Sequence, residues 1–164
     1  MQIFIHCRPK SAADAAMKPI QEAEGSDDEE MQRLEQEETF SVECVGFATN
    51  GMRWVASGGL DSTLKVWDLD NGSLRCTCVH SSVVTHLQWH SVHPMVFTST
   101  VGGSVCVWDA RAGLQLSEFT GHRAQITHFS IRPVTTERGP MDAVVTAADD
   151  HTSRVFLVDS AGLL

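Results

Sequence analysis

Apolar residues in the last three-quarters of the chain fall into short runs that alternate with polar residues or stay apolar for a few positions. Turns rich in Gly, Asn and Asp separate these runs. One such unit is "GGLDSTLKVWDLDNG" (residues 58–72), a turn, a short run that ends in Trp67-Asp68, and a second turn. Short runs with turn signals at roughly ten-residue intervals indicate β-strands joined by tight turns. The pattern therefore predicts an all-β fold.

The same unit recurs along the chain. Trp108-Asp109 closes "VGGSVCVWDARAG" 41 positions after Trp67, and three copies align over residues 41–79, 82–119 and 124–160. Each copy has the pattern strand, turn, strand, tight turn, strand, and the first two copies continue into a fourth strand. The third copy contains the insertion "VTTERGP", which we expect to be a surface loop because Pro and Gly favour turns.

A period near 40–45 residues with four strands and a Trp-Asp pair resembles the blade of the WD40 β-propeller family. This resemblance implies a buried hydrogen-bonded set of His, Ser or Thr, Asp and Trp in each blade, whose polar groups satisfy one another. The matching residues, which we expect to be structural and not catalytic, are Ser57, Asp61 and Trp67, then His80, Ser99 and Trp108, then His122, Thr146 and Asp150. No copy keeps the whole set, since Glu38, Gly102 and Phe156 occupy the remaining positions that the family pattern reserves for His, Asp and Trp.

The expected architecture is an all-β, partial WD40 β-propeller with three four-stranded blades plus an outer strand of a preceding blade. We assign residues 1–9 to that outer strand, 10–38 to a disordered acidic insertion, and 39–79, 80–120 and 121–160 to the repeats. Only "SAGLL" follows the third copy, which is too short for a complete outer strand. Three blades cannot close a ring, because propellers typically have 4–8 blades. We therefore expect remaining blades of a longer propeller, or self-association, to complete the structure.

Charge is concentrated in one segment. The net charge of the 164 residues is −9, and residues 21–38 contribute −8 of it, with nine acidic residues and Arg33. Such a segment has too little apolar surface to offset the entropy of ordering. Clustered carboxylates attract cationic proteins and repel nucleic acid, so the sequence predicts a basic protein partner and no nucleic-acid binding. Ser26 precedes four acidic residues and is a candidate phosphorylation site for an acidophilic kinase.

Neither the N-terminus nor the cysteines indicate secretion. "MQIFIHCRPK" lacks a basic region followed by a long apolar stretch, and the five cysteines have no disulfide-framework spacing. No apolar run approaches the roughly 18–20 residues of a membrane span, so we expect no membrane association. These features predict that the protein resides in a reducing compartment, namely the cytoplasm and also the nucleus.

We expect no enzymatic activity, cofactor or metal. His86, His90 and His93 span a strand and a turn, where positions i and i+4 lie about 13 Å apart. Cys76 and Cys78 are not a Cys-x-x-Cys pair. We interpret these side chains as ordinary strand and loop residues. The sequence also lacks nucleophile-elbow, P-loop and dinucleotide-binding motifs.

The order of the sequence motifs along the chain identifies a subfamily more specifically than the repeat pattern alone. An acidic spacer precedes "SVECVGF", "GGLDSTLKVWDL", "GGSVCVWDARAG" and "VVTAADDHTSRVFLV", and this order is similar to the C-terminal blades of the angio-associated migratory cell protein family. That family includes a fungal chaperone for a large-subunit ribosomal protein. The resemblance implies a non-enzymatic scaffold for protein binding in ribosome biogenesis, or a signalling and cell-migration scaffold.

One motif suggests another partner. Trp108, Asp109 and Arg111 form a Trp-Asp-x-Arg sequence that resembles the motif by which some WD40 proteins dock on the adaptor of a cullin ubiquitin ligase. The guanidinium of Arg111 would bind partner carbonyls or carboxylates. A substrate receptor of such a ligase is therefore an alternative function.

Overall fold

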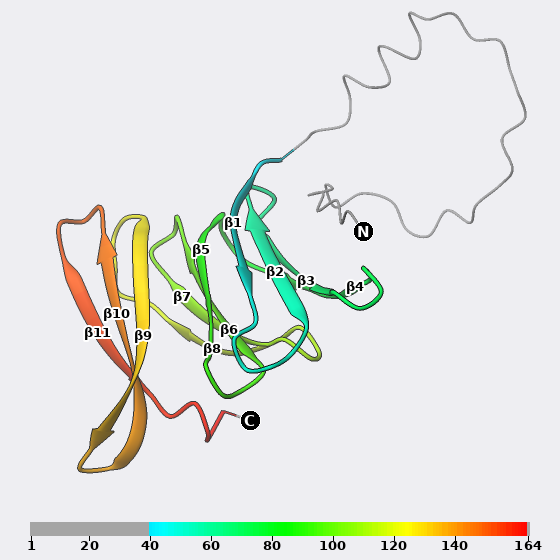
Figure 1. Cartoon of the computed structure of the whole chain (residues 1–164). Helices are drawn as coiled ribbons and strands as arrows, with labels where there is room; N and C mark the ends of the chain where they lie inside the picture. Colours follow the sequence, from blue (N-terminus) through cyan, green and yellow to red (C-terminus); the bar gives the residue numbers. More distant parts are fainter. Residues whose placement is uncertain (1–39, 164) are drawn as a thin grey trace, which may run out of the picture.

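A computed structural model describes residues 40–163. Within this range the chain forms eleven strands in three antiparallel sheets, and no helix (Figure 1). The outer strand predicted at 1–9, the acidic insertion at 10–38, Glu38 and Ser26 lie outside the described residues. The expectation of an all-β, open propeller segment is confirmed, because the sheets stand side by side without closing a ring.

Each sheet consists of strands that follow one another in the chain. The first is β1 (Val42–Phe47), β2 (Trp54–Gly59), β3 (Thr63–Asp68) and β4 (Leu74–Val79). The second is β5 (Val84–Trp89), β6 (Met95–Thr100), β7 (Val105–Asp109) and β8 (Leu114–Phe119). The third is β9 (Ile126–Thr136), β10 (Gly139–Ala148) and β11 (Ser153–Val158). We call these sheets blades 1, 2 and 3.

The blades pack face to face along their first strands, with β5 between β1 and β9 (Figure 1). We call the face of a blade that points towards the preceding repeat its front face, and the opposite face its rear face. The turns after β2, β6 and β10 lie at one end of the blades, the upper end in Figure 1, and the turns after β1, β5 and β9 lie at the lower end.

Two apolar cores lie between the blades. The first joins blade 1 to blade 2 through Ala56, Leu64, Val66, Cys78, Leu87, Trp89, Val96, Cys106, Trp108 and Ala110. The second joins blade 2 to blade 3 through Met95, Phe97, Val105, Val107, Ile126, Phe129, Ile131, Val144 and Val158. Blade 2 is covered on both faces, so every residue of β6 and β7 is buried. Strands covered on both sides are expected to be apolar throughout. This holds for β7 up to Asp109, whereas the second half of β6 consists of the hydroxyl residues Thr98, Ser99 and Thr100.

The insertion in blade 3 is a strand extension and not the expected surface loop. Val134, Thr135 and Thr136 pair with Met141, Pro140 and Gly139, so β9 and β10 form a long hairpin that projects at the lower end. β-Branched Val and Thr favour strands, and Glu137-Arg138 supply a two-residue turn before Gly139, whose φ is +109°. The prediction of a surface loop was therefore wrong. It rested on the turn preference of Pro and Gly, whereas the strand preference of Val134, Thr135 and Thr136 determines the structure.

Blade 3 also differs in its strand number. The expectation of three four-stranded blades is wrong for blade 3, which has three strands in the described residues, since the chain after Val158 continues in turns up to Leu163. This agrees with the short remainder after the third copy. The outer strand of this blade is therefore not supplied by residues 159–163.

Gly103→Ala is expected to destabilise the fold far more than Gly51→Ala. Both glycines have a left-handed backbone, with φ of +83° and +81°, but a Cβ at Gly103 would meet the His122 carbonyl oxygen at 2.7 Å. A Cβ at Gly51 would meet nothing within 4 Å. We expect a loss of about 3 kcal/mol at Gly103, from strain plus a backbone clash, against about 1 kcal/mol at Gly51. Urea unfolding followed by circular dichroism measures both, and equal losses would contradict this packing.

Candidate functional site

The turn before β5 is tied to blade 2 by a buried hydrogen-bonded cluster. The Trp108 indole N–H donates to His80 Nε2 at 2.9 Å and to Thr98 Oγ1 at 3.2 Å, and His80 Nε2 lies 2.8 Å from Thr98 Oγ1. Burial lowers the pKa of His80 to about 4, so the ring is neutral at pH 7 and can accept at Nε2. This cluster holds the upper turn against the strands.

Thr98, and not the expected Ser99, provides the hydroxyl of this cluster. Ser99 lies on the rear face, where its Oγ is 3.0 Å from Thr85 Oγ1. Residues 98–100 all carry hydroxyls, so composition alone could not choose among them. The spacing to the aromatic residue could have done so, because Ser57 precedes Trp67 by ten positions, as Thr98 precedes Trp108.

Blade 3 assembles a related cluster without an indole. His122 Nδ1 lies 2.9 Å from Asp150 Oδ2, and His122 Nε2 lies 2.7 Å from Thr146 Oγ1. Hydrogen bonds from the Thr152 hydroxyl and then from the Arg123 backbone N–H hold the pKa of Asp150 well below its usual range. Phe156 replaces the Trp and packs against the second core.

In blade 1 the same positions form two separate contacts. The Trp67 indole N–H donates to Ser57 Oγ at 3.2 Å. Asp61 accepts from the Thr63 hydroxyl at 2.8 Å and pairs with Lys65 Nζ at 2.9 Å. Burial alone would raise the pKa of Asp61, but hydrogen bonds from Lys65 and Thr63 outweigh burial and lower it. The His position, Glu38, lies outside the described residues.

The turn after β6 lacks the carboxylate that blades 1 and 3 possess. Gly102 follows Thr98 by four residues, as Asp61 follows Ser57 and Asp150 follows Thr146. His122 Nδ1 bonds to Asp150, whereas the buried Nδ1 of His80 has no hydrogen-bond partner among residues 40–163. A missing side chain in one turn therefore leaves an unsatisfied polar atom next to it.

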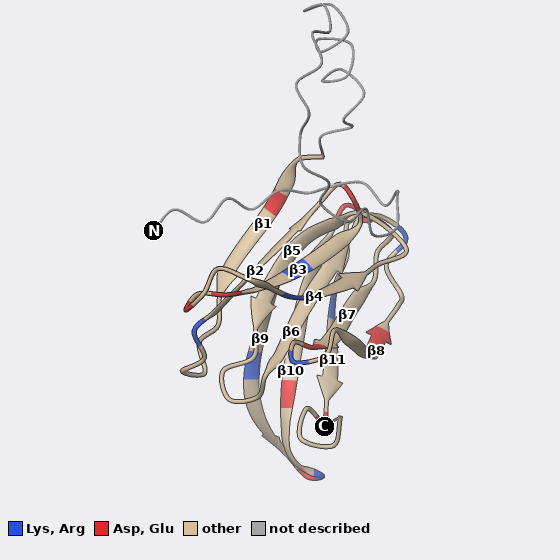
Figure 2. Ribbon diagram, turned by 90° about the vertical axis from the view of Figure 1, so that its right-hand side faces the viewer, with Lys and Arg blue, Asp and Glu red and all other residues tan. Residues whose placement is uncertain are grey.

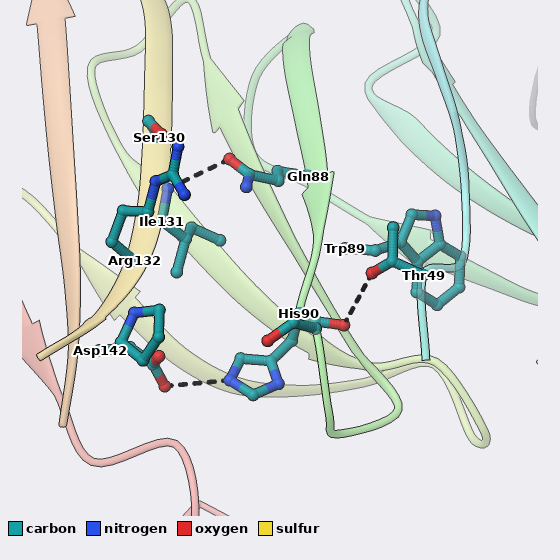
Figure 3. A pocket seen from close by; sticks show the side chains of 10 residues that line it. Thr49, Gln88, Trp89, His90, Ser130, Ile131, Arg132 and Asp142 are labelled. Carbon is teal, nitrogen blue, oxygen red and sulfur yellow. Dashed lines mark hydrogen bonds and ion pairs between the residues drawn. The ribbon is translucent and has the colours of Figure 1, made fainter. Parts of the chain in front are cut away.

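A pocket of about 360 Å³ lies at the lower end between blades 2 and 3, bordered by a turn of blade 1 (Figure 3). Its side chains include His90 and Asp142, which sequence reasoning did not pair. His90 Nδ1 accepts the backbone N–H groups of Val92 and His93, so Nε2 carries the proton and donates to Asp142 Oδ2 at 3.0 Å. Both ring nitrogens are thus occupied, and the pair fastens the turn after β5 to β10.

The Trp-Asp-x-Arg segment ends β7 at the lower end. The Arg111 guanidinium donates from Nε and Nη2 to both carboxylate oxygens of Asp109, at 2.9 and 2.8 Å. This fork lowers the pKa of Asp109. The Arg111 side chain remains 52% exposed, whereas Trp108 is buried in the cluster described above.

The histidines and cysteines do not assemble a metal site in the described residues. His90 stacks on His93 with ring centroids 4.9 Å apart, while His86 lies 4.5 Å from His128 on β9. No group of three His, Cys, Asp or Glu side chains between residues 40 and 163 is arranged to hold a metal ion. Nor does this range contain a helix that could cross a bilayer.

Comparison with known proteins defines the family. The family model "WD domain, G-beta repeat" matches residues 29–68 and 72–109. The angio-associated migratory cell proteins of Homo sapiens and Canis lupus familiaris are each 37% identical over 124 residues, which is 76% of this chain and 27% of theirs. The chain contains WD40 repeats. It spans about a quarter of the length of these relatives.

A solved structure supports the same fold. The crystal structure of Saccharomyces cerevisiae Sqt1 superimposes with a TM-score of 0.66 over 73% of this chain and 31% of that chain, at 24% sequence identity. The resemblance to the angio-associated migratory cell protein family is also confirmed. The WD40 repeats support a role as a scaffold for protein interaction.

Gly102→Asp is expected to stabilise the WD40 segment. The added carboxylate would lie where Asp150 lies in blade 3 and would accept a hydrogen bond from His80 Nδ1. A Cβ there would lie 3.3 Å from Ser82 Cβ, 3.5 Å from Ser82 Oγ and 3.6 Å from Thr100 Oγ1, so Ser82 must shift by a few tenths of an ångström, and Gly102 does not have a left-handed backbone. We expect a gain of about 1 kcal/mol at pH 7, from satisfying a buried donor. Gly102→Ala is the control, because it changes the backbone without adding an acceptor.

The pH dependence of unfolding gives a second readout of this substitution. The pKa of His80 falls from an ordinary 6.5 to about 4 on folding, so its contribution to stability is present above pH 6.5 and is lost as pH falls towards 4. The new carboxylate stabilises the imidazolium and raises the folded pKa. Gly102→Asp should therefore weaken this pH dependence, and an unchanged slope would show that the carboxylate does not reach His80.

Proposed function

We propose that this WD40-repeat chain is a non-enzymatic scaffold that binds a basic ribosomal protein and assists ribosome assembly. The observation that carries this proposal is the run of nine acidic residues and one basic residue at 21–38, which leads directly into blade 1. Clustered carboxylates raise the encounter rate with a cationic surface and favour its binding over anionic partners.

The described residues add carboxylates where this run joins the blades. The Ser41 carbonyl accepts the Leu60 N–H, which places the start of β1 beside the turn after β2, at the upper end. Glu43 on β1 and Asp149 after β10 are exposed at this end, and Figure 2 shows the acidic band on β1. A basic polypeptide at the upper end would meet these groups in addition to the acidic run.

The family resemblance also supports binding of a ribosomal protein, because the family includes a fungal chaperone for a large-subunit ribosomal protein. The proposal places the protein in the cytoplasm, where ribosomal proteins are made, and also in the nucleus, where they are assembled. A signalling or cell-migration scaffold, the other role that the resemblance implies, rests on no particular residue of this chain.

Neutralising Asp27, Asp28, Glu29 and Glu30 to their amides is expected to weaken binding to a basic ribosomal protein by about tenfold at moderate salt. The partner is first isolated by pull-down from dissociated large-subunit proteins, and its affinity is then measured by titration. A variant that permutes residues 21–38 at unchanged composition is the control, since it keeps the charge. Recovery of no basic ribosomal protein by the unaltered chain would refute the proposed function.

The geometry of Arg111 favours a second candidate, docking on the adaptor of a cullin ubiquitin ligase. Asp109 fixes the guanidinium in one orientation while half of the side chain stays accessible. A fixed guanidinium loses less entropy when it binds a carbonyl or carboxylate of a partner. In this role the chain would be a substrate receptor.

Arg111→Ala is expected to abolish adaptor binding if this second function holds. Arg53→Ala is the matched control, because Arg53 also lies at the lower end and pairs with Asp70 at 2.9 Å on the surface. Binding of purified adaptor is measured by biolayer interferometry. Equal affinities of the Arg111 variant and the unaltered chain would eliminate docking through this motif.

A further inference from the structure

One aspartate of the described chain is buried without a basic partner. The Asp142 side chain is 11% exposed and lies in the pocket between blades 2 and 3 at the lower end (Figure 3). Its Oδ2 accepts a hydrogen bond from His90 Nε2 at 3.0 Å. Among residues 40–163, no lysine or arginine forms an ion pair with this carboxylate.

His90 does not compensate the charge of Asp142. Its Nδ1 accepts the backbone N–H groups of Val92 and His93, at 3.1 and 2.8 Å, so this nitrogen carries no proton. An imidazole with one protonated nitrogen has no net charge. A proton on Nδ1 would break both hydrogen bonds that hold the turn after β5. The described residues therefore give the carboxylate one hydrogen bond and no opposite charge.

The other well-buried aspartates have basic partners or several hydrogen bonds. The Asp61 side chain, 3% exposed, pairs with Lys65, and the Asp109 side chain, 12% exposed, pairs with Arg111. Asp150 instead has four hydrogen bonds, two of them with backbone N–H groups. A buried carboxylate with one hydrogen bond and no cation costs free energy. Such an exception is expected where a ligand supplies the missing charge.

The walls of the pocket suit a slender aliphatic chain. The pocket has a volume of about 360 Å³, and Trp89, Ile131 and Pro133 give it apolar surface. The methylene groups of a long charged side chain pack on such surface while the charged end reaches a polar group. Arg132 also lines the pocket, but in Figure 3 its guanidinium points away from Asp142.

We propose that this pocket binds a lysine side chain of a partner protein, with the lysine ammonium on Asp142. Because His90 engages Oδ2, a single carboxylate oxygen remains for the ligand. An ammonium is a compact donor that one oxygen can bind, whereas the guanidinium fork of an arginine is matched to both oxygens.

The inference deepens the proposed function, and it rests on that function only for the basic character of the partner. The pocket lies at the opposite end of the blades from Glu43 and Asp149. It therefore binds a different segment of the basic partner from the one that meets the acidic run.

Titration of the isotope-labelled 164-residue chain with n-butylammonium chloride, followed by NMR, tests the site directly. At constant ionic strength we expect saturable shifts of the His90, Ile131 and Asp142 amide signals, with a dissociation constant of the order of 10 mM. The uncharged probe n-butanol should give no saturable shifts, and n-propylguanidinium should bind more weakly. Equal or tighter binding of either probe would overturn the assignment of a lysine site.

Asp142→Asn removes the charge and keeps an oxygen that accepts from His90 Nε2. We expect it to weaken n-butylammonium binding at least about tenfold, while the midpoint of urea unfolding stays the same or rises, because no unpaired charge is buried. Asp70→Asn is the matched control, since it removes a carboxylate at the lower end whose side chain is 60% exposed. A clear fall in the midpoint for Asp142→Asn would mean that the carboxylate only holds His90 in place, and would overturn the proposal.

Arg132→Gln provides a test of opposite sign at an exposed position, so it does not depend on the stability of a buried variant. Removing a positive charge from the pocket should strengthen n-butylammonium binding about two- to threefold. Arg123→Gln, at the upper end, is the control and should have no effect. Weaker binding by the Arg132 variant would show that the pocket does not select a cation. These titrations use no ribosomal protein, so a failure of this site and a failure of the proposed function are separate results.

Discussion

The close approach of Trp89 to the backbone of Gly46 sets the distance between the first two blades. The indole N–H donates to the Gly46 carbonyl at 2.9 Å, and a Cβ on Gly46 would meet Leu87 Cδ1 at 2.6 Å. A larger residue here would displace the end of the Leu87 side chain, so the glycine provides space and is not there for an unusual backbone angle. Without this contact the apolar side chains of both blades would face each other across a gap, and the first core would lose its packing.

Cross-blade hydrogen bonds repeat this relation at regular intervals. The Thr85 hydroxyl donates to the Ile126 carbonyl, and Gln88 Oε1 accepts the Ile131 N–H. At the lower end, Asn50 Nδ2 donates to the His93 carbonyl. The partners are separated by 41 or 43 residues, close to the spacing of the two Trp-Asp pairs. The inner strands are thus joined mainly by side chains that bond to the neighbouring backbone.

Much of the fold could be predicted from the sequence, because turn residues and the Trp-Asp spacing are local signals. The prediction of Ser99 in place of Thr98 failed because three consecutive hydroxyl residues fit a strand equally well, and of the sequence signals only the ten-residue spacing to Trp108 separates them. The "VTTERGP" segment was misread because a hairpin extension depends on a strand partner that local composition does not reveal. The His90–Asp142 pair joins residues 52 positions apart, off the repeat spacing, so no periodic comparison could find it.

Regular spacing of cross-blade bonds also bears on how such chains change length. Each hydrogen-bond partner lies one repeat away. When a whole repeat is gained or lost, the blade that becomes the new neighbour presents an equivalent residue, so every cross-blade hydrogen bond keeps both its donor and its acceptor. An insertion of a few residues inside a strand would shift the donors and acceptors out of register. The insertion between β9 and β10 avoids this, because it lengthens two strands that pair with each other. The number of blades can therefore change by whole repeats, and the turns at the blade ends can lengthen. The interiors of the strands do not tolerate the insertion or deletion of residues.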